Sequence, residues 1–479
     1  MSIYNVSKPD FSKSLWIVGS ALLAFMMAVL PIVTHWSVSY LLVAGILGVP
    51  ISVILVKYVR TGVYTLILVS MTLNIFRMLL PQVPVGIGMD YIILLMVLSC
   101  LFHDLNTKKF TFFKSPLTWA IFLWIGWHML ELMNPDAASR TAWFYVMRPA
   151  VGYIMLFFVT YRMFNTLKSI RQLLKYLWWL LFLSGTWGLI QYFNGYFKFE
   201  MDFLEANDMI HLVYIQGRWR CFGTLGSPSQ FGVAMAVGCV LSFMMFWVKG
   251  NTFEKIMYAI GGVVMMLSLV YSGTRTAYAV IPVGIGLMVV LAKNAKLYFF
   301  GLIGGACFWV LMILPTNNYH IKRIQSTFNS EEDASYLVRK QNRELITPYI
   351  LSHPMGGGLG STGVWGQRFS PNTFLANFPP DSGYMRVAVE MGWVGLIVYL
   401  MLWGRIILNT IMQYYGIKQR EYRWLGMAIL TSTLPLCVVE YAQDIISKLP
   451  FNVLFWVLIA LAINCNKLGA KEREKDAIT

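Results

Sequence analysis

The stretch that decides the fold is SQFGVAMAVGCVLSFMMFWV, residues 229–248, in which no position carries a charged side chain. A helix needs about 20 mostly apolar residues to cross the hydrocarbon core of a bilayer. The rest of the chain has the same character: hydrophobic residues make up 57% of 479 positions, charged residues 13%, and the mean hydropathy is +0.61. Soluble domains carry about 25% charged residues. The composition therefore excludes a soluble globular protein and predicts an all-α polytopic membrane protein.

Apolar stretches of this kind predict about 14 transmembrane helices, with 12 as the alternative count. They lie at residues 14–34, 37–59, 63–80, 87–103, 116–134, 146–164, 172–193, 229–248, 255–273, 276–293, 296–314, 384–409, 424–442 and 449–466. The first stretch lacks a small-residue cleavage site and is followed at once by another. We therefore expect a retained helix and not a signal peptide.

The distribution of Lys and Arg predicts the orientation. Most of these residues, which give the chain a net charge of +16, fall in short segments that alternate onto the same side as the N-terminus. Cytoplasmic loops carry such an excess, so both termini are expected in the cytoplasm. Basic runs with interleaved aromatic residues in a soluble domain are missing, and no nucleic-acid partner is expected. Membrane lipids are the expected surroundings.

Two long connections, residues 194–228 and 315–383, face outward in this topology. Residues 335–352 of the second place apolar side chains at helical spacing, which predicts an amphipathic helix with Arg339 and Arg343 on one face. The glycine run 356–360 then ends this helix and permits close backbone approach. The expected organisation is an N-terminal transmembrane bundle (1–193), a first outward loop (194–228), helices around the SGTRTAY string (229–314), a large outward loop (315–383) and C-terminal helices with a basic cytoplasmic tail (384–479).

Two clusters of arginines lie at the outward helix ends. Arg275, within SGTRTAY at residues 272–278, is either a snorkelling anchor or a ligand for a bulky anion, because its neighbours are small and a guanidinium fork matches phosphate. Arg218 and Arg220 open GRWRCFGTLGSPSQFG at residues 217–232. There Pro228 predicts a helix start whose free N–H groups face the same pocket. A solvated loop with a helix cap is the alternative.

Two further clusters complete the predicted site. Arg339, Arg343 and His353 accompany the string HPMGGGLG, and Asp381 and Arg386 open the stretch at residues 381–400. Arg386 and Glu390 are four apart and could simply pair. Together the clusters predict a positive outward pocket for a lipid diphosphate, in which a carboxylate or imidazole takes a proton from an incoming hydroxyl. Without ligand spacing among His, Cys, Asp and Glu, we expect no metal and no cofactor.

At these strings the sequence resembles the O-antigen ligase and O-antigen polymerase superfamily of bacterial envelope enzymes. Four segments carry the resemblance: the run from Arg220 to Phe231, SGTRTAY, RELITPYILSHPMGGGLG and DSGYMRVAVEMGWVGL. Their common order on one side of a multispan protein makes the match fairly specific. The first 200 residues match only in being hydrophobic.

The resemblance implies a GT-C type fold and a metal-independent glycosyltransferase at the periplasmic face of the bacterial inner membrane. The donor is a glycan on undecaprenyl diphosphate, and the acceptor is another glycan, lipid A-core or a protein. A chain-length regulator protein is a candidate partner. A polymerase is our preferred interpretation, a ligase is the nearest alternative, and a flippase of lipid-linked glycans is a more distant one.

The resemblance also assigns candidate roles. It implies that Arg275 and an arginine of the first loop, Arg218 or Arg220, engage the diphosphate, together with Arg339 or Arg343. Asp381 stands where ligases usually carry a His. Either Asp381 is the base, or His353 supplies it, or the substitution marks a polymerase branch. Arg386 is a further candidate for diphosphate binding, without a secure family counterpart.

Overall fold

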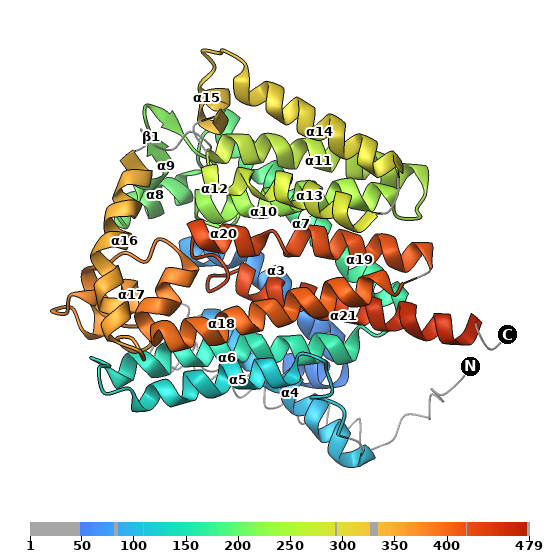
Figure 1. Ribbon diagram of the computed structural model, residues 1–479, viewed down its shortest axis with the longest axis horizontal. Coiled ribbons are helices and arrows are strands. Elements are labelled where there is room, and N and C mark those ends of the chain that lie inside the picture. The colour runs from blue at the N-terminus through green and yellow to red at the C-terminus, as the bar shows by residue number, and fades with distance from the viewer. Residues whose placement is uncertain are drawn as a thin grey trace, which may run out of the picture.

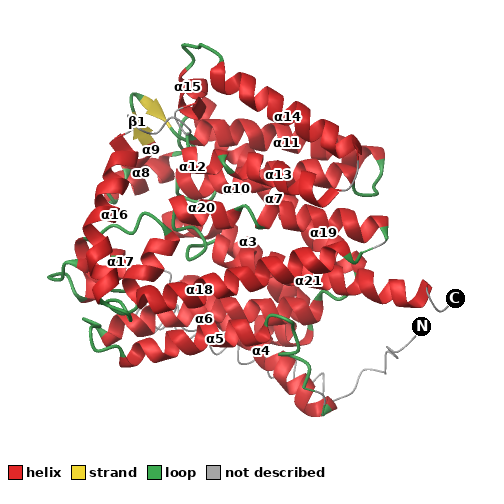
Figure 2. Ribbon diagram, in the orientation of Figure 1, coloured by secondary structure: helices red, strands yellow, loops and turns green. Residues whose placement is uncertain are grey.

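The computed structural model describes residues 48–80, 85–108, 110–292, 295–325, 334–417 and 419–476. Most of this part of the chain is helical, as Figure 2 shows. The strands within it are β1 (Tyr214–Ile215) and β2 (Arg218–Trp219), which pair antiparallel. The prediction of an all-α polytopic protein is confirmed.

Within the described residues, eleven helical segments are long and apolar enough to cross a membrane. They are α3 (Val59–Leu79), α4 (Val85–Thr107), α6 (Arg140–Met163), α7 (Leu167–Asn194), α10 (Pro228–Trp247), α11 (Thr252–Ser272), α12 (Arg275–Tyr278) with α13 (Val280–Ala292), α14 (Ala295–Ile313), α18 (Gly383–Tyr415), α19 (Arg420–Thr433) with α20 (Leu436–Ala442), and α21 (Phe451–Asp476).

The predicted span at 116–134 is shorter than expected. It folds as α5 (Thr118–Leu130) followed by the 3-10 turn η2 (Glu131–Met133). Thirteen α-helical residues rise about 20 Å, less than the apolar thickness of a bilayer. The predicted span 14–34 lies outside the described residues, and only the end of 37–59 is described, as a short helix at Gly48–Lys57.

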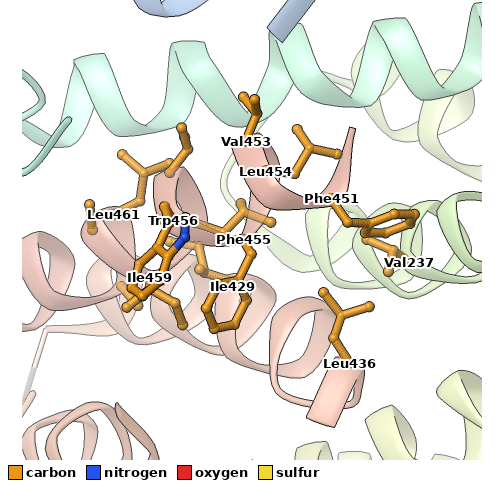
Figure 3. Packing of buried hydrophobic residues seen from close by; sticks show 14 of the residues in the cluster. Val237, Ile429, Leu436, Phe451, Val453, Leu454, Phe455, Trp456, Ile459 and Leu461 are labelled. Atoms are coloured by element: carbon orange, nitrogen blue, oxygen red, sulfur yellow. The ribbon is translucent and has the colours of Figure 1, made fainter. Parts of the chain in front are cut away.

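Burial separates the inner helices from those that face lipid. In α10, 78% of the apolar window is buried, and in α21 the share is 83%, whereas in α14 it is only 6%. Figure 3 shows Phe451, Phe455 and Ile459 of α21 packed with Ile429 of α19 and Leu436 of α20. Helices that are apolar all round belong inside a bundle or against lipid, so α14 is an outer, lipid-facing helix.

The elements of the two long loops gather at one end of the bundle, on the left of Figure 1, and the C-terminal end of α21 lies at the other. They are α8 (Lys198–Ala206), α9 (Ile210–Val213), the β1–β2 hairpin, α15 (Tyr319–Gln325), α16 (Ala334–Ser352), α17 (Gly363–Phe369) and the 3-10 turn η3 (Leu375–Asn377). The amphipathic helix predicted at 335–352 is therefore present as α16.

The glycine-rich run after α16 docks on a break in α18. Gly392 has φ 68°, and a Cβ there would lie 1.9 Å from the carbonyl oxygen of Pro354. The Gly357 N–H donates to Val389 O at 2.9 Å, which satisfies a carbonyl freed by the break. Glycine on both sides permits this backbone approach, so the large loop is fixed against the membrane bundle.

Candidate diphosphate site

Arg218 lies on the β1–β2 hairpin, within the first loop. Gln216 and Gly217 both have positive φ, 52° and 76°, which is typical of the tight turns that match the twist of a hairpin. The turn sends the chain back so that the Arg218 guanidinium carbon lies 5.0 Å from the centre of the Tyr319 ring on α15. A cation over an aromatic face is held electrostatically, and the hairpin thereby contacts the larger loop.

Arg220 fastens the first loop to the SGTRTAY string. Its Nε donates to Ser272 O at 2.8 Å, and its two terminal nitrogens donate to Thr274 Oγ1 and Leu212 O, both at 3.2 Å. Thr274 Oγ1 in turn donates to Pro228 O at 2.7 Å, at the start of α10. Burial and the neighbouring Arg323 lower the pKa of Arg220 to about 10, so it stays charged at neutral pH.

Gly273 separates α11 from α12 and makes room for two guanidinium groups. Its φ of 59° is left-handed, and a Cβ there would lie 3.1 Å from Arg323 Nε and 3.4 Å from Arg220 Nε. Arg323 Nε also donates to Gly273 O at 2.7 Å. Only glycine combines this conformation with such close neighbours at low cost.

Arg323 is a member of the cluster that the sequence patterns did not single out. It lies on α15 in HIKRIQ, and its terminal nitrogen donates to Tyr319 Oη, four residues earlier, at 3.0 Å. The only available signal was that spacing of an arginine and a tyrosine by one helical turn. Arg323 joins Arg220 on the two sides of Gly273.

Arg275 begins α12, half-buried, within electrostatic range of both Arg323 and Arg339. Its neighbour Thr276 donates from Oγ1 to Gln443 Oε1 at 2.8 Å, in the segment that follows α20. Arg323 of α15, Arg275 of α12 and Arg339 of α16 therefore share one region.

The outer end of α18 meets α16 and α20 in the same region. Arg343 donates to Tyr441 Oη at 2.7 Å and lies 5.0 Å from that ring centre. The adjacent Asn342 donates from Nδ2 to Asp381 Oδ2 at 3.2 Å. Two adjacent residues of α16 thus contact Tyr441 of α20 and the half-buried Asp381.

His353 lies away from this group. It follows the C-terminal end of α16, where its ring stacks on Tyr349 with centroids 4.0 Å apart and its Nδ1 lies 2.9 Å from both Tyr349 O and Ser352 Oγ. Since a helix rises about 1.5 Å per residue, His353 lies on the order of 15 Å from Asn342 along the axis. The structure does not bring His353 to Asp381.

Arg386 points into a different environment. Its guanidinium makes ion pairs with Asp444 at 3.3 Å and with Glu390 at 3.8 Å, and both carboxylates are buried. Glu390 also accepts a hydrogen bond from Thr362 Oγ1 at 2.6 Å. Glu390 and Asp444 therefore balance the charge of Arg386 inside the protein. The pair with Glu390 is the one that the four-residue spacing predicted, whereas the sequence did not indicate Asp444 as a partner.

The grouped arginines concentrate positive charge in one region. Arg218, Arg220, Arg339 and Arg343 have no salt bridge to a carboxylate in the part of the chain that the structure describes. Several guanidinium groups in one region favour phosphate oxygens, which accept charge-assisted and bidentate hydrogen bonds. Across the described ranges, no three His, Cys, Asp or Glu side chains lie close enough together to hold a metal ion.

Residues 260–400 match a protein-family model described as O-antigen ligase. The matched range begins inside α11 and ends inside α18, so it contains Arg275, Arg339, Arg343 and Asp381. No curated protein matches the chain. The match confirms the resemblance found in the sequence motifs, and it supports glycan transfer of the ligase or polymerase kind, with a lipid-linked glycan as partner. The chain is therefore a multi-pass membrane protein whose residues 260–400 are similar to the O-antigen ligase family.

Proposed function

We propose that the protein is a polymerase that transfers glycan repeat units carried on undecaprenyl diphosphate to a growing O-antigen, capsule or exopolysaccharide chain. The reaction takes place at the periplasmic face of the bacterial inner membrane. The observation that carries the proposal is the meeting of Arg275, Arg339 and Arg343 with Asp381 at one end of the bundle. A cationic site with an adjacent carboxylate suits a diphosphate leaving group and an incoming hydroxyl.

The proposed reaction is a displacement at the anomeric carbon of the donor sugar. The Asp381 carboxylate accepts the proton of the acceptor hydroxyl, and the hydroxyl oxygen forms the new bond to that carbon. The bond from the same carbon to the diphosphate oxygen breaks, and undecaprenyl diphosphate leaves with the electron pair. The arginines stabilise the charge that develops on the leaving oxygen.

Asp381 is the base in this proposal because of where the two candidates lie. Asp381 is held by Asn342, next to Arg343. His353 is on the order of 15 Å further along α16 and is occupied by Tyr349 and Ser352. A base has to reach the proton that it removes by a direct hydrogen bond or through one water.

A ligase that transfers finished glycan to lipid A-core or to a protein is the second candidate. The description of the matched family, O-antigen ligase, favours it. Donor, leaving group and base are the same in both reactions, and the acceptor alone differs.

Reconstitution of the full chain in proteoliposomes with an undecaprenyl-diphosphate oligosaccharide tests the proposal. Longer glycans on the same lipid indicate a polymerase, and transfer to added lipid A-core indicates a ligase. Asp381→Ala should remove the product in either case, while Asn207→Ala serves as a control, because Asn207 bonds only locally, to Phe203 O at 2.8 Å. If labelled substrate only crosses the bilayer and no new glycosidic bond forms, the enzyme proposal is wrong.

A further inference from the structure

A cavity of about 400 Å³ lies between α5, α6, α18 and α21, beneath the segment that leads into α17. Small-molecule sites in proteins have volumes of about 300–1,000 Å³, so the cavity is large enough for a ligand. No residue of the arginine cluster lines this cavity. The proposed transfer reaction assigns it no role.

Aromatic side chains form much of the cavity wall. Trp124 and Tyr399 lie with ring centroids 5.0 Å apart, and Phe455 and Trp456 of α21, both labelled in Figure 3, lie 5.1 Å apart. Trp365 of α17 lines the cavity from the loop side. Aromatic rings offer large, rigid, apolar faces, and the C–H faces of a pyranose ring stack on such surfaces.

The polar groups in the cavity suit hydroxyl groups better than a net charge. Arg386 is paired with Asp444 and Glu390, and the second cation of the lining, Lys448, lies 3.9 Å from Asp444. Glu440 adds a third carboxyl group to the lining, so the cavity does not attract an anion as the arginine cluster does. Carboxylate oxygens accept hydrogen bonds and guanidinium N–H groups donate them. A sugar with several hydroxyl groups uses both, and it remains neutral.

Asn452 supplies a second, independent indication of a ligand. It lines the cavity and is only 8% exposed, yet its Oδ1 has no hydrogen-bond partner among the residues that the structure describes. Buried polar atoms are nearly always hydrogen-bonded. A donor group that enters the cavity, such as a ligand hydroxyl, would satisfy this acceptor on a residue of the cavity wall.

The cavity also borders the proposed reaction centre. Pro380 is part of its lining, and Asp381 follows directly, held by Asn342 of α16 on the side of the arginines. On the other flank, Ser382 Oγ donates to Glu440 O at 3.1 Å, and Glu440 lines the cavity as well. Asp381 therefore lies at the boundary between the cavity and the arginine cluster.

We propose that this cavity binds a neutral sugar residue of the acceptor glycan, and that it thereby delivers an acceptor hydroxyl to Asp381. The assignment of the acceptor role rests on the proposed transfer function, whereas the binding of a sugar does not. Aromatic walls, the balanced Arg386 and the unpaired Asn452 Oδ1 together favour a hydroxyl-rich neutral ring over a lipid chain or an anion.

Sugar binding is measured without any donor, by saturation-transfer NMR on the full chain in lipid nanodiscs. The probes are the methyl glycosides of neutral hexoses, deoxyhexoses and N-acetylhexosamines. We expect binding of at least one probe, weakened roughly tenfold by Asn452→Leu, which removes one hydrogen bond and leaves a ligand hydroxyl unpaired. Ala150→Phe, which fills the cavity from α6, should abolish it.

Asn409→Leu is the matched control, because Asn409 lies on α18 outside the cavity and donates only to Arg405 O at 2.8 Å. It should leave binding unchanged, as should Arg275→Ala in the arginine cluster. No binding by any probe overturns the proposal, and so does equal binding by wild type, Asn452→Leu and Ala150→Phe. If sugars bind as expected but no glycan is transferred in proteoliposomes, the transfer function fails while the sugar site stands.

Discussion

Arg220→Lys tests whether the geometry of the first loop, and not only its charge, supports the site. Lysine keeps the positive charge but cannot reproduce the fork that reaches Ser272 O, Leu212 O and Thr274 Oγ1. If lysine restores one of these three bonds, two are lost, at about 0.5–1.5 kcal/mol each for a partly exposed group. The hydrogen bonds that fix the junction of α11 and α12, which carries Arg275, thus become weaker by about 1–3 kcal/mol in total.

If this energy positions Arg275 in the transition state, the transfer rate should fall roughly 5- to 150-fold, since 1.4 kcal/mol corresponds to a factor of ten. The rate is measured in proteoliposomes at saturating donor. Arg405→Lys is the control, because Arg405 lies nearer the opposite end of α18 and contacts Trp119 through a cation–π interaction that lysine also makes. A wild-type rate for Arg220→Lys, or an equal loss for both variants, would refute the reasoning.

Two further substitutions address the packing around the site. Gly273→Ala should lower the free energy of unfolding by about 1–2 kcal/mol from its left-handed φ alone, and with it both the melting temperature and the transfer rate. In the control Gly286→Ala, the added Cβ meets no atom within 4 Å, so neither quantity should fall. An unchanged melting temperature and rate for Gly273→Ala would contradict the account. Arg386→Met should destabilise the protein by about 3–5 kcal/mol, because Glu390 would keep a buried charge without its cationic partner and Asp444 would keep only Lys448, at 3.9 Å. Thermal unfolding in detergent measures the loss, and a melting temperature equal to that of the wild type would mean that these carboxylates are not held by Arg386.

The membrane fold followed from the sequence because a lipid environment imposes a simple rule. Every backbone polar group in the bilayer needs an internal partner, so long apolar stretches become helices. The span predicted at 116–134 was less accurate, since hydropathy does not show that α5 ends at Leu130. The helix α16 was predictable as well, because the apolar residues Ile346, Tyr349 and Ile350 follow helical spacing and pack in one cluster with residues of α18, although Leu337, Val338 and Leu345 are exposed.

The site was only partly predictable. Arg275 and Asp381 stand in strings of unusual composition, but the local signal for Arg323 is only its four-residue spacing from Tyr319, and it joins the cluster through the docking of α15 on Gly273. The group around Arg386 needed the tertiary structure, because Asp444 lies in the connection between α20 and α21, far along the chain. Residues that meet only through helix packing leave no spacing pattern in the sequence.

The most direct test of the central claim is the affinity of the protein for undecaprenyl diphosphate in nanodiscs. If Arg275 engages the diphosphate through charge-assisted hydrogen bonds, Arg275→Ala should raise the Kd roughly 10- to 150-fold, from a loss of about 1.5–3 kcal/mol. Arg405→Ala is the control, because Arg405 lies nearer the opposite end of α18 and over Trp119, at 5.3 Å. Unchanged binding by Arg275→Ala, or an equal loss in Arg405→Ala, would contradict a diphosphate site at the arginine cluster.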